Sequence, residues 1–177
     1  MFFRRLMTPG PAKTAGRRLY AAIVARARDP DLYARLGAPD TPDGRFEVYS
    51  LHVLLALERL RGEGGAGSAV GQALFDAYLT GLDHGLRELA VGDLAVGRTM
   101  KKLAGAFYGR GKALDEALAA LPDRSPLEAL LSRTVFAGDP DRDPAPLAEH
   151  VLRLRGDLAA IAPERLLAGE LDLAMAQ

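Results

Sequence analysis

The strongest constraint on the fold is the stretch from Gly71 to Arg110, where apolar residues recur at helical spacing through two successive segments. The first segment carries one broad apolar stripe with polar residues on the other side, which is typical of an amphipathic helix. The members of this stripe are Leu74, Phe75, Tyr78, Leu79, Leu82, Leu86 and Leu89. A narrower row of small residues repeats every four positions and allows another backbone to approach closely. This row is Ala73, Ala77, Gly81 and Gly85. The pattern predicts a helix that is packed on two sides.

A short turn is expected to separate this helix from a second one. Gly92 suits the left-handed conformation that ends a helix, and Asp93 suits the capping position that starts the next. The second helix has a single apolar face, which consists of Val96, Met100, Leu103 and Phe107. Its opposite face is basic and free of acids, with Arg98, Lys101, Lys102 and, further along, Lys112.

The rest of the chain shows further helical periodicity and no convincing period-two alternation, which predicts an all-α fold. We expect helices from Thr14 to Arg28, from Asp31 to Leu36 and from Arg45 to Arg61. Further helices follow Arg110, and the last long one lies beyond about residue 144. Apolar residues cover nearly all sides of the segment that starts at Arg45, so this helix is predicted to be central and buried.

Three connectors rich in proline, glycine or aspartate are expected to be irregular, namely APDTPDGRF, GEGGAGSAV and GDPDRDPAP. The aspartates of the first connector lack the number and spacing of an EF-hand, which favours turn and capping roles over cation binding. Those of the third connector are expected to lie in a solvated loop rather than to bind calcium. The glycines of the second connector are not followed by the lysine of a phosphate-binding loop.

The length of 177 residues favours one domain. We expect a flexible N-terminal segment at residues 1–13 and an all-helical domain at residues 14–177, with the last helix and tail from about residue 144 as a peripheral part. The fold class is thus a single-domain multi-helix bundle with irregular connectors. The last helix carries Leu147, Val151, Leu154, Leu158 and Ile161 at heptad-like spacing, a seam that packs either on the domain or on a partner.

Composition argues against several classes of function. The 23 Lys and Arg residues balance the 23 Asp and Glu residues, so net charge gives no reason to expect DNA as a partner. Cysteine is absent, which excludes disulfides and thiolate metal sites. His52, His84 and His150 fall on separate predicted helices without metal-binding spacing, and His52 is expected in the core. No catalytic or nucleotide-binding motif is present, so we expect no enzyme, no metal and no cofactor.

The first residues, MFFRRLMTPGPAKTAGRR, lack the long apolar region of a secretory signal. No apolar run is long enough to span a bilayer. We therefore expect a place in the bacterial cytoplasm, including the periphery of the inner membrane.

Specific strings between Leu19 and Gly111 resemble the ubiquinol–cytochrome c chaperone family. The strings are LGAPDTPDGRFE, VGDL and FYGR. The resemblance implies an assembly factor for ubiquinol–cytochrome c reductase (respiratory complex III) that binds newly made cytochrome b or another hydrophobic membrane-protein client. It also implies contact with the ribosome or an anionic membrane surface and a small partner protein, and it implies no catalytic residues.

Two candidate surfaces follow. The client would use an apolar surface of Phe75, Tyr78, Leu79 and Leu82, and the alternative for this stripe is the core. The ribosome or an anionic membrane would contact a basic face, whose alternative is a merely solvated surface. Its residues are Arg98, Lys101, Lys102, Arg110, Lys112, Arg17 and Arg18. A second hypothesis is a structural protein–protein interaction or membrane-surface docking module without a cytochrome b client, in which the seam of the last helix mediates docking.

Overall fold

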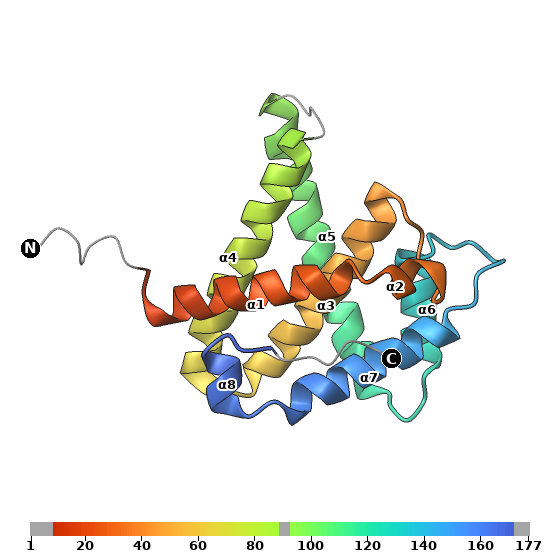
Figure 1. Cartoon of the computed structure of the whole chain (residues 1–177). Coiled ribbons are helices and arrows are strands. Elements are labelled where there is room, and N and C mark those ends of the chain that lie inside the picture. The colour runs from red at the N-terminus through yellow and green to blue at the C-terminus, as the bar shows by residue number, and fades with distance from the viewer. Residues whose placement is uncertain (1–8, 89–92, 172–177) are drawn as a thin grey trace, which may run out of the picture.

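The computed structural model describes residues 9–88 and 93–171, and within these ranges the chain forms eight helices and no strand (Figure 1). In chain order they are α1 (Pro11–Ala27), α2 (Pro30–Ala34), α3 (Pro42–Arg61), α4 (Gly64–Glu88), α5 (Asp93–Ala119), α6 (Ser125–Thr134), α7 (Ala145–Ala160) and α8 (Pro163–Leu167). The all-α prediction is confirmed.

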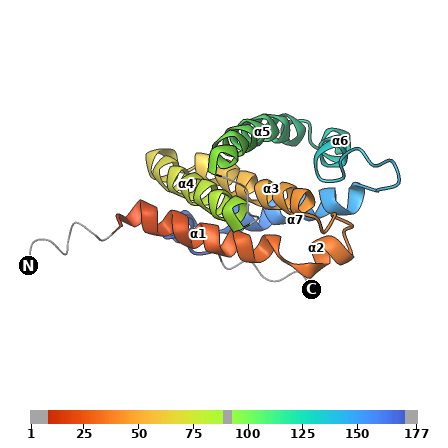
Figure 2. The same cartoon turned by 90° about the horizontal axis from the view of Figure 1, so that it is seen from above.

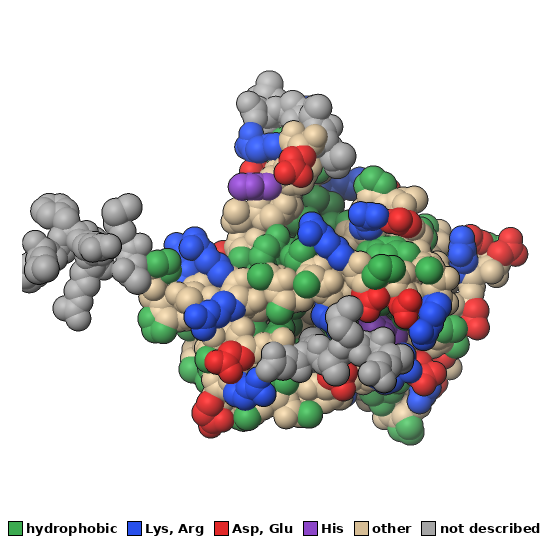
Figure 3. All heavy atoms as spheres, viewed as in Figure 1, with side chains coloured by type: hydrophobic (Ala, Val, Ile, Leu, Met, Phe, Trp, Pro, Cys, Tyr) green, Lys and Arg blue, Asp and Glu red, His purple; other side chains and the backbone are tan. Residues whose placement is uncertain are grey.

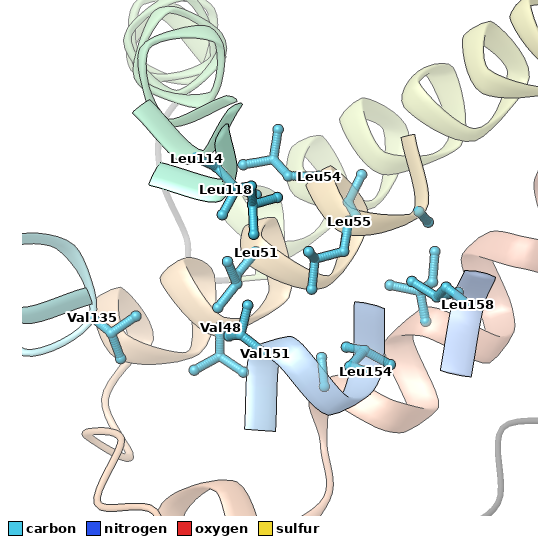
Figure 4. Packing of buried hydrophobic residues seen from close by; sticks show 14 of the residues in the cluster. Val48, Leu51, Leu54, Leu55, Leu114, Leu118, Val135, Val151, Leu154 and Leu158 are labelled. Atoms are coloured by element: carbon cyan, nitrogen blue, oxygen red, sulfur yellow. The ribbon is translucent and has the colours of Figure 1, made fainter. Parts of the chain in front are cut away.

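Helix α3 occupies the centre of the molecule, as its apolar residues on all sides predicted. Every residue from Ser50 to Ala56 is buried. Figure 4 shows the leucines of α3 between Leu114 and Leu118 of α5 on one side and Val151 and Leu154 of α7 on the other. Burial on both sides makes α3 the common support of the remaining helices.

Helices α4 and α5 run side by side and extend beyond the other helices (Figures 1 and 2). We call this pair of helices, α4 and α5, the arm. Helix α1 crosses the lower part of the arm and packs most extensively against α4. The crossing is close because Gly16 of α1 faces Ala73 and Leu74 of α4 without a side chain between them. A Cβ atom at Gly16 would lie 2.6 Å from the Ala73 carbonyl carbon.

Two helices begin at a proline, three residues before the start that the sequence predicts. Helix α1 starts at Pro11 rather than Thr14, and α3 starts at Pro42 rather than Arg45. The Thr41 hydroxyl accepts a hydrogen bond from the Gly44 backbone N–H at 3.1 Å and so caps α3. A proline is favourable at a first helical position, where its missing N–H has no partner in any case. The end of the connector APDTPDGRF is therefore helical.

The prediction that GEGGAGSAV interrupts the chain is wrong, because α4 begins at Gly64 and includes most of this segment. Gly67 is buried where α3 turns into α4, and a Cβ atom there would lie 2.1 Å from the Leu60 carbonyl oxygen. The glycine thus permits a tight contact between successive helices, and this packing outweighs its low helix propensity.

Helix α7 is part of the core. Its residues Leu147, Val151, Leu154 and Leu158 are at most 3% exposed, and α7 packs on α3 and α6. Docking of a partner through this seam, as the second hypothesis required, is therefore wrong. Gly92 and Leu89 lie outside the described residues, as do residues 1–8 and the end of the tail, and the Asp93 capping contact is likewise not described.

Candidate functional site

A large groove lies between the arm and the end of α1, α2 and the start of α3. Its volume is about 910 Å³, which is at the upper end of the range for ligand-binding clefts. Figure 3 shows apolar side chains at the foot of the arm and over α1, bordered by charged groups. The apolar lining comes mainly from aromatic and branched residues, including Tyr20, Val24, Tyr33, Phe46, Tyr49, Leu82, Leu86 and Leu103.

The row of small residues on α4 shapes one wall of this groove. Gly81 and Gly85 both line it. A Cβ atom at Gly81 would lie 1.8 Å from the Tyr20 hydroxyl oxygen, so this glycine lets α1 and α4 approach. A Cβ atom at Gly85 would meet nothing within 4 Å. Gly85 therefore leaves space in the groove, which a larger side chain would fill.

A series of aromatic contacts connects the groove with the interior of the arm. The ring centroids of Tyr20 and Tyr49 lie 6.1 Å apart, those of Tyr49 and Tyr78 5.0 Å, and those of Tyr78 and Phe107 4.8 Å. The Ser50 hydroxyl donates to the Phe46 carbonyl oxygen at 2.7 Å, so the Tyr78 hydroxyl donates to Ser50 at 2.8 Å. The aromatic rings thus fix α1, α3, α4 and α5 relative to one another.

The polar rim of the groove contains one closed ion pair and two other charges. Arg45 donates to the Asp40 carboxylate at 2.5 Å and lies over the Tyr33 ring, 5.8 Å from its centroid. This hydrogen bond lowers the pKa of Asp40. Arg28 and Asp43 also line the groove, and within the described part of the chain neither forms an ion pair.

The predicted apolar surface is only partly available. Leu82 lines the groove. Phe75 and Leu79 are half-buried and pack against the core. Tyr78 is fully buried at 0% exposure, so it belongs to the core and not to a surface. Burial is also the main reason why the pKa of Tyr78 is raised.

Periodicity alone missed the aromatic side of the groove. Tyr20, Tyr33, Phe46 and Tyr49 are four of the chain's 11 aromatic residues, six Phe and five Tyr. In a chain that is only 6% aromatic, their concentration around the connector APDTPDGRF is a signal that sequence reasoning could have used.

The predicted basic face divides into separate parts. Arg98, Lys101 and Lys102 are exposed on α5 in the arm. Lys112 is exposed but lies 3.8 Å from Glu116. Arg17 and Arg18 are exposed on α1 near its crossing with the lower arm, where Arg18 donates to the Ala168 carbonyl oxygen at 3.4 Å.

Arg110 points inward and does not join the exposed basic residues. Two of its nitrogens donate to the carboxylate of Glu47 on α3. Burial raises the pKa of Glu47, and Arg110 opposes that rise. Arg110 therefore serves as the partner of a mostly buried acid, which corrects its predicted place on the basic face.

His52 and His150 lie side by side in the core. The His52 ring is 4% exposed and its Nδ1 lies 2.7 Å from the Val48 carbonyl oxygen, as expected for a core residue. The ring centroids of His52 and His150 lie 5.9 Å apart. Within residues 9–88 and 93–171, no three acidic or histidine side chains are placed to hold a metal ion. No helix in these ranges is both long and apolar enough to cross a membrane.

Comparisons with known proteins agree with the all-helical architecture. The model of the ubiquinol–cytochrome C chaperone family matches residues 34–174. The crystal structure of the Cbp3 homolog from Brucella abortus aligns with a TM-score of 0.83 and 40% identity, covering 99% of this chain and 94% of that chain.

Two animal proteins are more distant relatives. Ubiquinol-cytochrome c reductase complex assembly factor 1 of Mus musculus is 27% identical over 124 residues, and the Xenopus laevis protein of that name is 25% identical over 124 residues. The alignments cover 70% of this chain but only 41% of the mouse protein and 61% of the frog protein. The match of the family model over most of the chain shows that this protein belongs to the ubiquinol–cytochrome c chaperone family.

Proposed function

We propose that this protein is a non-enzymatic assembly chaperone for ubiquinol–cytochrome c reductase, and that it holds newly made cytochrome b, or a similar hydrophobic membrane protein, in the groove. The observation that carries the proposal is a groove of about 910 Å³ lined by aromatic and branched side chains. A hydrophobic segment that has not yet entered its complex needs such a surface to leave water. The names of the animal relatives support ubiquinol–cytochrome c reductase as the complex concerned.

The position of the groove suits transient binding. One wall is the arm, and the opposite wall comes from α1, α2 and α3. The tyrosines present an apolar ring with a polar end, which favours contact with segments that cross from apolar to polar surroundings. We further propose that the protein works in the bacterial cytoplasm, including the periphery of the inner membrane, where a client of this kind emerges.

The variant Gly85→Leu tests the groove directly. A leucine at this position extends into the groove where a Cβ atom meets nothing within 4 Å. We expect at least about a tenfold loss of affinity for cytochrome b, because the groove is narrowed at its α4 wall. The measurement is the amount of newly synthesised cytochrome b that the purified protein captures in a cell-free translation reaction.

Gly156→Leu is the matched control. Gly156 lies in the interior of α7, is exposed, and also has open space where its Cβ atom would be. Both variants replace an open helical glycine by leucine, so both should fold at least as stably as the wild-type chain. Equal capture of cytochrome b by the two variants would show that the groove is not the client site.

A second proposal concerns the exposed cations of α5. Arg98, Lys101 and Lys102 have no ion-pair partner within the described residues, which supports a surface for the ribosome or for anionic lipid. The double variant Lys101→Glu, Lys102→Glu should lower association by about tenfold at low salt, and the difference should shrink as the salt concentration rises.

Sedimentation with ribosomes and with vesicles containing phosphatidylglycerol measures this association. Lys112→Glu is a control on the same helix, because Lys112 already lies beside Glu116. Association that is unaffected by both salt and the double variant would refute a role for this surface.

A further inference from the structure

The groove has a polar corner where α1 ends. Arg28 is the C-cap residue of α1 and lines the groove. Tyr33 stands beside it, and its hydroxyl donates to the Ala27 carbonyl oxygen at 2.7 Å. The Tyr49 hydroxyl is buried and forms no hydrogen bond of regular geometry, and after burial the neighbouring Tyr20 hydroxyl is the next cause that raises its pKa. The corner thus combines an exposed cation, which forms no ion pair within the described residues, with the rings of Tyr33 and Tyr49.

Arg28 and the phenols of Tyr33 and Tyr49 line the same groove. Burial raises the pKa of Tyr33 and of Tyr49, and the positive charge of Arg28 partly opposes both rises. Arg45, the other arginine of the rim, is already neutralised by Asp40 at 2.5 Å. Among the cations that line the groove, Arg28 is therefore the one whose charge is available to an occupant.

Asp43 restricts where an anion can lie in the groove. It lies in the first turn of α3, lines the same groove and forms no ion pair within the described residues. The four charged residues of the rim, Arg28, Arg45, Asp40 and Asp43, sum to zero. A carboxylate and a lipid phosphate would each be attracted by Arg28 and repelled by Asp43, so either anion would lie at the Arg28 corner. Because the proposed client is a hydrophobic polypeptide, we take the anion to be a single carboxylate at the Arg28 corner, with the rest of the groove left to apolar contacts.

We propose that the groove recognises an apolar helical segment carrying an acidic side chain, and that the carboxylate pairs with Arg28. The inference rests on the proposed function and names the chemistry of the client segment. A carboxylate at this corner accepts charge-assisted hydrogen bonds from the guanidinium, and these are stronger than hydrogen bonds between neutral groups. Arg28 then determines which of several hydrophobic segments the groove prefers and in which direction the segment lies.

The probes are synthetic apolar helical peptides in detergent micelles. Each peptide of the series carries one glutamate, which is moved by one position along a helical turn from peptide to peptide. For each of them, the same peptide with glutamine in place of the glutamate is the control. Binding is measured by fluorescence anisotropy. The wild-type chain should bind the best glutamate peptide about tenfold more tightly than its glutamine partner. Arg28→Gln should abolish this preference, and Arg28→Glu should transfer it to the matching lysine peptide. Arg17→Gln, an exposed arginine of α1 outside the groove, should keep the preference.

Gly85→Leu separates the proposal that the groove is the client site from the proposal that Arg28 pairs with a carboxylate of the client. If it abolishes binding of all peptides while the wild-type chain does not prefer glutamate, the groove remains the client site and the role of Arg28 is refuted. If it changes the binding of no peptide, the groove proposal itself is refuted. Arg28-dependent binding of phosphatidylglycerol vesicles, without a preference for glutamate, would assign the corner to a lipid headgroup and overturn the inference.

Discussion

Gly16→Ala is expected to lower the free energy of unfolding by about 3 kcal/mol, because the new methyl group has no room between two crossing helices. The Cβ atom would lie 2.6 Å from the carbonyl carbon and from the Cβ of Ala73, and 2.6 Å from the Leu74 nitrogen. Two of these atoms belong to the backbone, so no side-chain rotation relieves the contact. Helices α1 and α4 must separate, and the packing between them is lost along the crossing.

Urea unfolding followed by circular dichroism measures this change. Gly156→Ala is the control, since its Cβ atom meets nothing within 4 Å and alanine raises helix propensity by up to about 1 kcal/mol. The two variants make the same chemical change inside a helix and should shift stability in opposite directions. If Gly16→Ala were as stable as Gly156→Ala, the close crossing of α1 and α4 would be incorrect.

Acid should destabilise the protein well before its carboxylates are protonated. Burial lowers the pKa of His52 to about 4 and also lowers that of His150, with the positive charge of Arg26 acting in the same direction on both. The positive charge of Arg153 also lowers the pKa of His150, whereas Asp29 and Asp157 raise it. Asp29 also raises the pKa of His52. These acids offset only part of the lowering that burial causes. Above about pH 6.5 these histidines are neutral in the folded and unfolded chain, and their stabilising contribution is complete.

The direction of the change in the free energy of unfolding with pH follows from proton uptake. As the pH falls below 6.5, the unfolded chain binds protons at these histidines while the folded chain does not. For His52 alone this removes about 2 kcal/mol between pH 7 and pH 5, and the loss continues towards pH 4. The raised pKa of Glu47 acts in the opposite direction, because there the folded chain takes up the proton more readily.

Urea unfolding at a series of pH values between 7 and 5 checks the prediction. The double variant His52→Asn, His150→Asn should be less stable at pH 7 but should show a much flatter pH dependence. His84→Asn changes an exposed histidine and should retain the wild-type slope. A steep slope that persists in the double variant would place its origin elsewhere.

The helices could be predicted because each buries a face whose spacing is visible in the sequence. Helix α3 was correctly expected at the centre, since its apolar residues surround it. The starts of α3 and α4 were missed for a physical reason. Pro42 lies in a connector that the sequence predicts to be irregular, yet it stands at a favourable first position of α3. Gly67 lies in another such connector, yet it permits the close contact with Leu60 that continues the chain as a helix.

The groove was predicted less well because it arises between helices that are distant in the sequence. The stripe on α4 pointed to Leu82, but periodicity does not distinguish Leu82 at the groove from Tyr78 in the core. Arg110 belonged to a basic pattern on α5, and only the packing of α5 on α3 brings Glu47 to it. The relative placement of α1, α3 and the arm cannot be predicted from the residue pattern of any single helix.

The distribution of the tyrosines has a practical consequence. The chain contains no tryptophan and five tyrosines, of which Tyr20, Tyr33 and Tyr49 line the groove. Three of the five tyrosine rings therefore lie at the groove itself, and a tryptophan placed in a bound peptide would accept energy from them. Occupancy can be followed optically on the unlabelled protein, with the surrounding residues left unchanged.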